Sequence, residues 1–372
     1  MQYLAVLGRQ PEISLAELEA LFGGVRQISG GLAVFSCERD FGEGEERQFL
    51  QRLGGSLKIA KMVDGAILEF LSALPEGKLT IGVSDYASGA SARKAQGEAL
   101  KLKKILARHG RSVRVVENKS AVLSSATSLH NGLAGNNPRK VELILNGGVW
   151  WKVVWAQDIE AYARRDQARP ARDAKVGMLP PKLAQILINL CGNLPAGARI
   201  LDPFCGTGVV LQEALLMGYE AYGTDIEPRM VEYSEKNLRW LECDKTELFL
   251  LSTGDATDFR WTGRVDAVAC EAFLGQPMSL PPAEIKLKGE MQRCSGIILG
   301  FLRNLGEQID SETPVVVAMP AWLRPDGSYS RMKIVDEICG LGYNVSNKSR
   351  AGLLYCRPGQ VVARDIIILR KK

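Results

Sequence analysis

The sequence predicts an α/β protein whose C-terminal half forms a doubly wound, mostly parallel sheet. Two observations lead to this prediction. Residues 198–225 read as a strand, a glycine-containing loop, a helix and a second strand that ends in an acid, which is the unit that nucleotide-like ligands use. Beyond this unit, short apolar runs alternate with longer segments of helical character as far as residue 369, and such alternation is typical of doubly wound folds.

Length and composition limit the class of protein. A chain of 372 residues fits two or three domains, and 46% hydrophobic residues predict packed cores. No apolar run is long enough to span a bilayer and no signal-peptide pattern is present, so we expect a cytoplasmic protein that does not contact membranes. The eight cysteines show no C-x-x-C spacing and only two histidines occur, so we expect no metal site and no disulfide framework.

The first half of the chain predicts smaller α/β units. Residues 3–7 alternate as a strand, and Ser14 with Glu17 reads as a capping box at the start of a helix. The pair Gly147-Gly148 between two apolar runs predicts a two-residue hairpin turn. The other elements expected here are strands over 31–36, 59–63, 79–84, 112–116, 141–146 and 149–155 and helices over 49–53, 91–109 and 124–133.

A connector separates the two halves. Residues 158–181 are polar, basic and interrupted by Pro170 and by Pro180-Pro181, a composition that favours a linker between domains. An apolar helix over 183–191 then leads into the glycine-loop unit. The elements expected after the first strand are helices over 209–217, 229–240, 282–305 and 332–341 and strands over 220–223, 249–252, 265–270, 315–319, 352–355 and 366–369, the last two as a hairpin.

The loop after the first strand of this half indicates the kind of ligand. Residues 202–208 read D-P-F-C-G-T-G, which is neither a dinucleotide nor a triphosphate signature. The carboxylate of Asp202 precedes the loop, where it would repel a phosphate and attract the sulfonium and ammonium groups of S-adenosylmethionine. The competing interpretation is a plain strand–helix turn in which the glycines serve geometry alone.

Four successive strands of this half end in acids, at the edge where open α/β sheets bind ligands. We expect Asp202 to face the amino acid part of the cofactor, Asp225 to bind the ribose hydroxyls, and Asp255 with Ala256 to bind the adenine amino group. Any single acid here is also a common helix cap. The predicted cofactor-binding residues are Asp202, Phe204, Cys205, Gly206, Gly208, Asp225, Ile226, Asp255, Ala256 and Glu271.

The end of the fourth strand predicts the catalytic residues Glu271, Phe273 and Leu274. Methylation of an exocyclic amine needs acceptors for the hydrogens of the amine, and a carboxylate with a backbone carbonyl can supply them. An aromatic ring can hold the base by stacking. The alternative is that Glu271 is a structural acid and Phe273 a core residue.

Basic residues gather in two segments, over 93–119 and 164–182. Such clusters favour contact with a polyanion, although a solvated helix face gives the same pattern. The predicted RNA-binding residues are Arg93, Lys94, Lys101, Lys104, Arg165, Arg169 and Lys182.

Several of these motifs resemble the THUMP-domain RNA methyltransferases, above all the family that makes N2-methylguanosine at position ten of tRNA in archaea and eukaryotes. The residues that carry the resemblance are the D-P-F-C-G-T-G loop with Glu213-Ala214, the linker segments 165–170 and 177–184, Ser124-Ser125-Ala126 with His130-Asn131, and the C-terminal segments 357–360 and 364–366.

The resemblance implies a domain plan and a substrate. Residues 1–50 would be a ferredoxin-like subdomain, 51–156 a THUMP RNA-binding domain, 157–181 a linker and 182–372 a Rossmann-like S-adenosylmethionine-dependent methyltransferase domain. It further implies tRNA as the substrate and a small activator subunit as a candidate partner.

One segment departs from the family. The family motif is D-P-P-Y or a close variant before glycine, whereas this chain has Glu271-Ala272-Phe273-Leu274 before Gly275. The acid is one methylene longer and both prolines are absent. Two alternatives to a tRNA guanine-N2 methyltransferase therefore stay open: a tRNA-binding protein with impaired catalysis, and a methyltransferase of ribosomal RNA.

Overall fold

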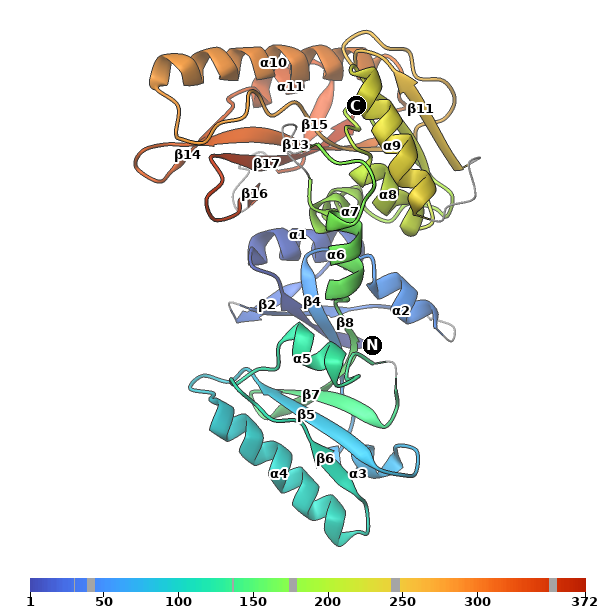
Figure 1. Cartoon of the computed structure of the whole chain (residues 1–372), viewed down its shortest axis with the longest axis vertical. Coiled ribbons are helices and arrows are strands. Elements are labelled where there is room, and N and C mark those ends of the chain that lie inside the picture. Colours follow the sequence, from blue (N-terminus) through green and yellow to red (C-terminus); the bar gives the residue numbers. More distant parts are fainter. Residues whose placement is uncertain (30, 39–43, 136, 174–178, 242–247, 348–352) are drawn as a thin grey trace. The chain divides into compact units, whose positions relative to one another are not determined.

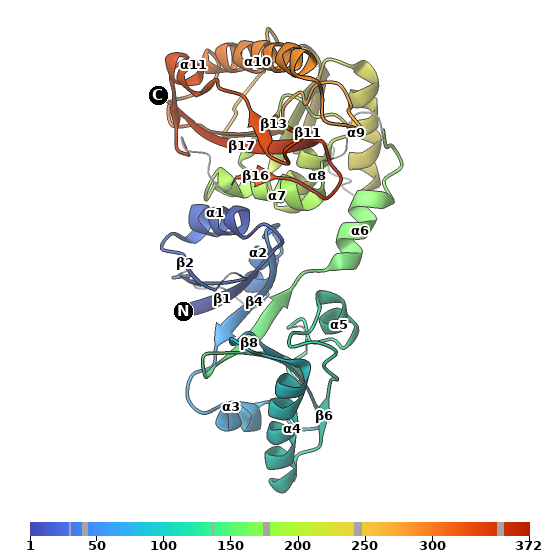
Figure 2. The same cartoon turned by 90° about the vertical axis from the view of Figure 1, so that its left-hand side faces the viewer.

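The computed structural model describes residues 1–29, 31–38, 44–135, 137–173, 179–241, 248–347 and 353–372. It divides into two compact units, Met1–Tyr162 and Ala163–Lys372 (Figures 1 and 2). Gly177 and Met178 of the predicted linker motif, and Gly352 of a predicted strand, lie outside the described residues. None of the helices in the described ranges is long and apolar enough to cross a bilayer.

The described part of the N-terminal unit is built on one sheet of eight strands in the order β2-β3-β1-β4-β8-β7-β5-β6. The strands are β1 Gln2–Leu7, β2 Arg26–Ser29, β3 Leu32–Ser36, β4 Ser56–Met62, β5 Leu79–Asp85, β6 Val113–Val115, β7 Lys140–Asn146 and β8 Val149–Ala156. The helices are α1 Pro11–Phe22, α2 Glu45–Leu50, α3 Ile67–Ala73, α4 Ala92–Arg108 and α5 Ser125–His130, and α6 Ile159–Gln167 follows β8.

This sheet continues across the predicted boundary at residue 50, because β4 pairs with β1 on one side and with β8 on the other. The three predicted boundaries between the four segments stay predictions. The predicted turn at Gly147-Gly148 is confirmed, since both residues have positive φ (57° and 82°) and the flanking residues Asn146 and Val149 are paired.

In helix α4, the hydrophobic pattern of the sequence matches the face that is buried. Ser91 caps it by accepting a hydrogen bond from the Lys94 amide. Its buried residues are Ala95, Ala99, Leu102 and Leu106, a spacing that forms one helical stripe. The helix packs against the sheet beside β5 and β6 (Figure 1), and Ala99, Leu102 and Leu106 belong to one buried cluster with residues of these strands.

The predicted capping box at Ser14 and Glu17 is wrong. Helix α1 begins at Pro11, so both residues lie inside it, and both are buried. Ser14 Oγ donates to the carbonyl of Gly55 at 2.6 Å, and Glu17 accepts the amides of Gly54 and Gly55 at 2.9 and 2.8 Å. Glu17 therefore anchors a distant loop, and Ser14 joins that loop to the segment before the helix, because its Oγ also accepts a hydrogen bond from the Gly8 amide at 3.3 Å.

The C-terminal unit is a doubly wound sheet, as predicted. Its main path runs β11-β10-β9-β12-β13-β17-β15, with β14 paired to β13 and β16 to β17. The strands are β9 Arg199–Asp202, β10 Glu220–Asp225, β11 Phe249–Thr253, β12 Ala267–Glu271, β13 Pro314–Leu323, β14 Tyr329–Arg331, β15 Tyr343–Val345, β16 Leu354–Tyr355 and β17 Val362–Lys371. The helices are α7 Pro181–Leu190, α8 Val209–Leu216, α9 Pro228–Trp240, α10 Glu284–Gly306 and α11 Val335–Gly340.

Strands β9 to β13 run parallel, and β17 is antiparallel to β13, β15 and β16. The antiparallel pairing of β16 with β17 confirms the predicted C-terminal hairpin. Helix α10 packs through Cys294, Ile298 and Phe301 on one face of the sheet, and α7 and α8 lie on the opposite face (Figure 1). Both faces of the central strands are thereby covered, as parallel sheets require.

Candidate functional site

The order of the strands places the switch point of the sheet at the carboxyl end of β9, where a ligand crevice is predicted. The chain passes from β9 to β10 and β11 on one side, then returns to β12 on the other side of β9. Strand order reverses at this point, and open α/β sheets bind their ligands at such a point. Asp202, Asp225 and Glu271 are the last residues of β9, β10 and β12, so the topology gathers them at one edge.

The glycine loop has the backbone that the sequence predicts. Gly206 and Gly208 have φ of 51° and 82°, a region that favours glycine. A Cβ on Gly208 would lie 2.9 Å from Ser234 Oγ. The loop is tied to β10, because the Cys205 amide donates to the Thr224 carbonyl at 2.9 Å and the Gly206 amide donates to Asp225 Oδ2 at 2.9 Å.

The acids make this edge of the sheet, where the crevice is predicted, electronegative. Asp202 is 2% exposed and accepts a hydrogen bond from the Phe204 amide at 3.1 Å. Burial raises the pKa of the Asp202 carboxyl well above its ordinary value, the Phe204 amide lowers it, and the negative charges of Asp225 and Glu271 raise it again. Burial likewise raises the pKa of Asp225, against the amides of Glu227 and Gly206, which lower it. A bound cation would relieve this repulsion.

The predicted adenine end lies after β11. Asp255 Oδ1 accepts hydrogen bonds from the amide and hydroxyl of Thr257 at 2.9 and 2.8 Å. Ala256 is buried, and its carbonyl accepts a hydrogen bond from Asn304 at 3.0 Å. Ile226 is 68% exposed beside Asp225, an apolar surface that a planar ring could cover. The assignment of these residues to adenine stays a prediction.

Glu271, Phe273 and Leu274 lie together at and after the end of β12, and all three are half-buried. The guanidinium of Arg293 lies 4.9 Å from the centre of the Phe273 ring. Stacking of a base on Phe273 would therefore use the other face of the ring or displace Arg293. Glu271 Oε1 accepts a hydrogen bond from Arg364 Nε at 2.7 Å, a partner that no local pattern in the sequence indicates.

The predicted RNA-binding residues fall into two groups. Arg93, Lys94, Lys101 and Lys104 are exposed on α4, within an arc of about 100° at 100° per residue. This placement suits contact with a polyanion.

The linker residues have partners inside the C-terminal unit instead. Arg165 Nε donates to the buried Glu213 at 2.8 Å, and Arg169, 3% exposed, donates to Thr207 Oγ1 at 3.1 Å. Lys182 is half-buried at the start of α7. The burial of Arg165 and Arg169 favours a structural role, and RNA contact by these three residues stays a prediction.

Asn237 joins the linker to the glycine loop. Its side chain is fully buried on α9; Nδ2 donates to the carbonyls of Ala171 and Thr207 at 2.9 and 2.8 Å, and Oδ1 accepts the Ala171 amide at 3.0 Å. Nothing in the sequence marked this residue beyond its place on the inner face of a helix. The linker is thus part of the support of the glycine loop.

We expect Asn237→Ala to weaken cofactor binding and to lower the free energy of unfolding by about 1–3 kcal/mol, because buried backbone groups of the loop and the linker lose their partners. Calorimetry with S-adenosylhomocysteine and urea unfolding measure the two effects. Asn118→Ala is the matched control, since Asn118 is a buried amide of the N-terminal unit that donates to Val83. Equal cofactor affinity in both variants would contradict a role for Asn237 in the loop.

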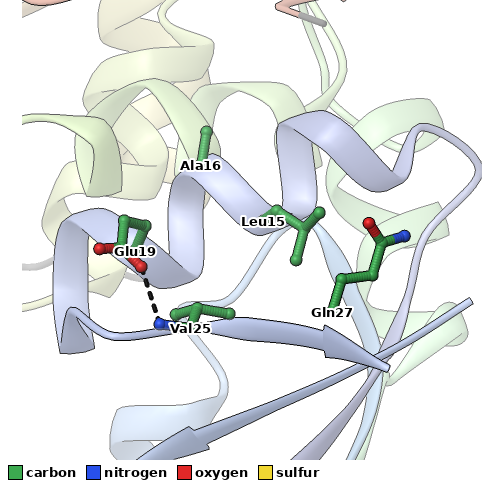
Figure 3. A pocket seen from close by; sticks show the side chains of 5 residues that line it. All are labelled: Leu15, Ala16, Glu19, Val25 and Gln27. Atoms are coloured by element: carbon green, nitrogen blue, oxygen red, sulfur yellow. Dashed lines mark hydrogen bonds between the residues drawn. The ribbon is translucent and has the colours of Figure 1, made fainter. Parts of the chain in front are cut away.

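A hollow of about 290 Å³ in the N-terminal unit is lined by Leu15, Ala16, Glu19, Val25 and Gln27 (Figure 3). Glu19 Oε2 accepts the Val25 amide at 2.8 Å, so its carboxylate serves the turn between α1 and β2. Glu19 is the only acid among the described residues that line this hollow, so the hollow does not offer the set of three carboxylates found at the ends of β9, β10 and β12. Among the described residues, no three His, Cys, Asp or Glu side chains are arranged to hold a metal ion.

Comparison with known proteins agrees with this geometry. Residues 169–294 match the family described as RMKL-like, methyltransferase domain. The chain is 34% identical over 160 residues to the tRNA (guanine(10)-N2)-dimethyltransferase of Methanothermobacter thermautotrophicus, covering 42% of this chain and 44% of that protein. It is 26% identical over 292 residues to the Pyrococcus abyssi protein of the same name, covering 76% and 80%.

Among solved structures, TrmN from Thermus thermophilus is 19% identical and aligns over the whole of both chains with a TM-score of 0.49. The stretch matched to the Methanothermobacter relative spans less than half of that protein. The predicted resemblance to an RNA methyltransferase is confirmed, because residues 169–294 match the RMKL-like methyltransferase domain and the chain is similar to proteins named tRNA (guanine(10)-N2)-dimethyltransferase. The THUMP part of the resemblance stays a prediction.

Proposed function

We propose that this protein is an S-adenosylmethionine-dependent tRNA methyltransferase that modifies the exocyclic N2 of a guanosine, at position ten. The observation that carries the proposal is the set of three carboxylates around a positive-φ glycine loop at the switch point of the sheet. The names of the relatives supply the substrate class. The proposal also includes the predicted cytoplasmic location and the predicted small activator subunit.

The residues of the crevice fit the cofactor. When bound, S-adenosylmethionine supplies an electrophilic methyl group on a positively charged sulfur. Asp202 and its acidic neighbours stabilise positive charge, because their burial and mutual repulsion favour any cation that enters. Asp225, fixed by two backbone amides, has lone pairs left for hydroxyl groups. Glu271 accepts hydrogens from the target amine and so turns the nitrogen lone pair away from the carboxylate.

The exposed arc of α4 supplies the sequence-independent part of tRNA binding. Arg93, Lys94, Lys101 and Lys104 present positive charge to phosphates, and such contacts position RNA without reading its bases. Selection of one guanosine then falls to the crevice. We expect tRNA affinity to decrease as salt increases.

The test is incubation of the purified full-length protein with unmodified tRNA and labelled S-adenosylmethionine, followed by mass spectrometry of the nucleosides. N2-methylguanosine or N2,N2-dimethylguanosine at position ten is the expected product. Salt-sensitive tRNA binding without any methylated nucleoside would favour the RNA-binding protein with impaired catalysis. Label in ribosomal RNA but not in tRNA would favour the other alternative.

Affinity for S-adenosylmethionine should rise with pH. The raised pKa of Asp202 means that its carboxyl holds a proton at a pH where an exposed aspartate has lost it. A cation favours the ionised form, so binding releases this proton and weakens as pH falls through the raised pKa. Calorimetry across a pH series measures the slope.

Two controls test whether the pH dependence of S-adenosylmethionine affinity comes from Asp202. S-Adenosylhomocysteine lacks the sulfonium charge, so its affinity should change less with pH. Asp202→Asn removes the titrating group and should flatten the S-adenosylmethionine profile. Equal slopes for the two ligands on the unmodified protein would rule out Asp202 as the source.

A further inference from the structure

Arg364 stands behind the carboxylate that is proposed to hold the target amine. Its Nε donates to Glu271 Oε1 at 2.7 Å, and the two side chains are 5% and 13% exposed. Arg364 lies on β17, whereas Glu271 ends β12, and β13 runs between these strands. The pair therefore reaches across a whole strand at the carboxyl edge of the sheet.

The register explains how the pair can form. Glu271 is opposite Ala318 of β13, and Arg364 is opposite Pro320 of the same strand. Residues two apart on a strand share a face, so Glu271 and Arg364 lie on the same side of the sheet. The short side chain of Ala318 leaves the path between the two charged groups open.

A second contact orients the guanidinium. Arg364 Nη1 donates to Gln360 Oε1 at 3.3 Å. An arginine keeps its charge in proteins and offers no acceptor, so its Nε–H stays available as a donor to one oxygen of the carboxylate at any pH. Among the described residues, Glu271 Oε2 has no hydrogen-bond partner.

We propose that Arg364 is a positioning residue for methyl transfer: it binds Glu271 Oε1 and thereby aims Oε2 at the amino group of the base. This inference rests on the proposed function. A glutamate has one more rotatable bond than an aspartate, so a fixed partner such as Arg364 limits the conformations that Glu271 can adopt.

The experiment compares full-length Arg364→Met and Arg364→Lys with the unmodified protein on tRNA. We expect Arg364→Met to lower kcat by about 10- to 100-fold, the effect of a misplaced catalytic group, while KM for tRNA and cofactor affinity change less than about threefold. Arg364→Lys keeps the charge and should recover part of kcat. A loss confined to KM, or to cofactor affinity, would overturn the positioning role.

Arg331→Met is the matched control for lost stability. Arg331 lies 3.4 Å from the buried Asp365, the neighbour of Arg364 in sequence. We expect it to lower the melting temperature while kcat stays unchanged. Equal losses of kcat in Arg331→Met and Arg364→Met would show that Arg364 acts through stability alone.

A double-mutant cycle completes the test. If Arg364 acts through Glu271, kcat of Glu271→Gln with Arg364→Met should equal that of Glu271→Gln alone. If the double variant instead shows the product of the two single-variant losses of kcat, the proposal is wrong. A failure of the proposed function looks different: the unmodified protein would then transfer no methyl group to any tRNA, and both proposals would fall.

Discussion

Replacement of Glu271 with glutamine should lower kcat for methyl transfer to tRNA by about 10²–10³-fold, the size of effect seen when one group that meets developing charge is lost. The glutamine oxygen can still accept the Arg364 Nε–H at the 2.7 Å position. The other end of the amide then presents an NH₂ donor to a substrate amine that is itself a donor. The substitution therefore changes the acceptor that faces the substrate and keeps the support behind it.

Two further measurements distinguish a catalytic role of Glu271 from a structural one. Cofactor affinity, measured by calorimetry, should stay within about threefold, because Glu271 contributes charge at a distance and the glycine loop is held by Asp225 and Thr224 instead. Glu271→Asp keeps the negative charge on a side chain that is one methylene shorter. Its kcat should therefore lie between that of the unmodified protein and that of Glu271→Gln. Full activity of Glu271→Gln would exclude a catalytic role for this acid and favour the structural interpretation.

The second large effect concerns stability of the N-terminal unit. Lys58→Met should lower the free energy of unfolding by about 3–5 kcal/mol, the usual loss when one partner of a buried ion pair is removed. Lys58 Nζ lies 2.5 Å from Glu142 Oε1, and the side chains are 2% and 0% exposed. Without Lys58, Glu142 would remain as a buried charge without its counterion.

The loss of stability expected for Lys58→Met should also affect α5. Glu142 also accepts hydrogen bonds from the hydroxyls of Ser84 and Ser128, at 2.7 and 2.5 Å, and Ser128 lies on α5. Urea unfolding measures the stability, and Lys58→Met with Glu142→Gln is the control, since removing both charges should restore much of the loss. If the double variant were less stable than Lys58→Met, the cost would not come from an unpaired carboxylate.

The sequence anticipated the features that depend on neighbours along the chain. The strand–loop–helix unit around Gly206 and Gly208, the hairpin at Gly147-Gly148 and the buried stripe of α4 all follow from local backbone preference and hydrophobic period. It also anticipated that Asp202, Asp225 and Glu271 would meet, because carboxyl ends of parallel strands share one edge.

Local patterns were insufficient where a polar residue had a distant partner. Ser14 and Glu17 have the spacing of a capping box, yet they bind the loop at Gly54 and Gly55. Arg165 and Arg169 read as solvent-facing basic residues, yet they bind Glu213 and Thr207 in the C-terminal unit. Charge and spacing alone do not tell an exposed cation from a buried one.

By itself, therefore, the sequence determined the class of fold, the acidic crevice and the kind of ligand that suits it, because these follow from short-range geometry and from the residue at each strand end. Only the tertiary structure decided how the acids are supported. Glu271 and Arg364 are 93 positions apart, and Lys58 and Glu142 are 84 apart. Sheet order and register brought each pair together, and burial away from water made each pairing necessary.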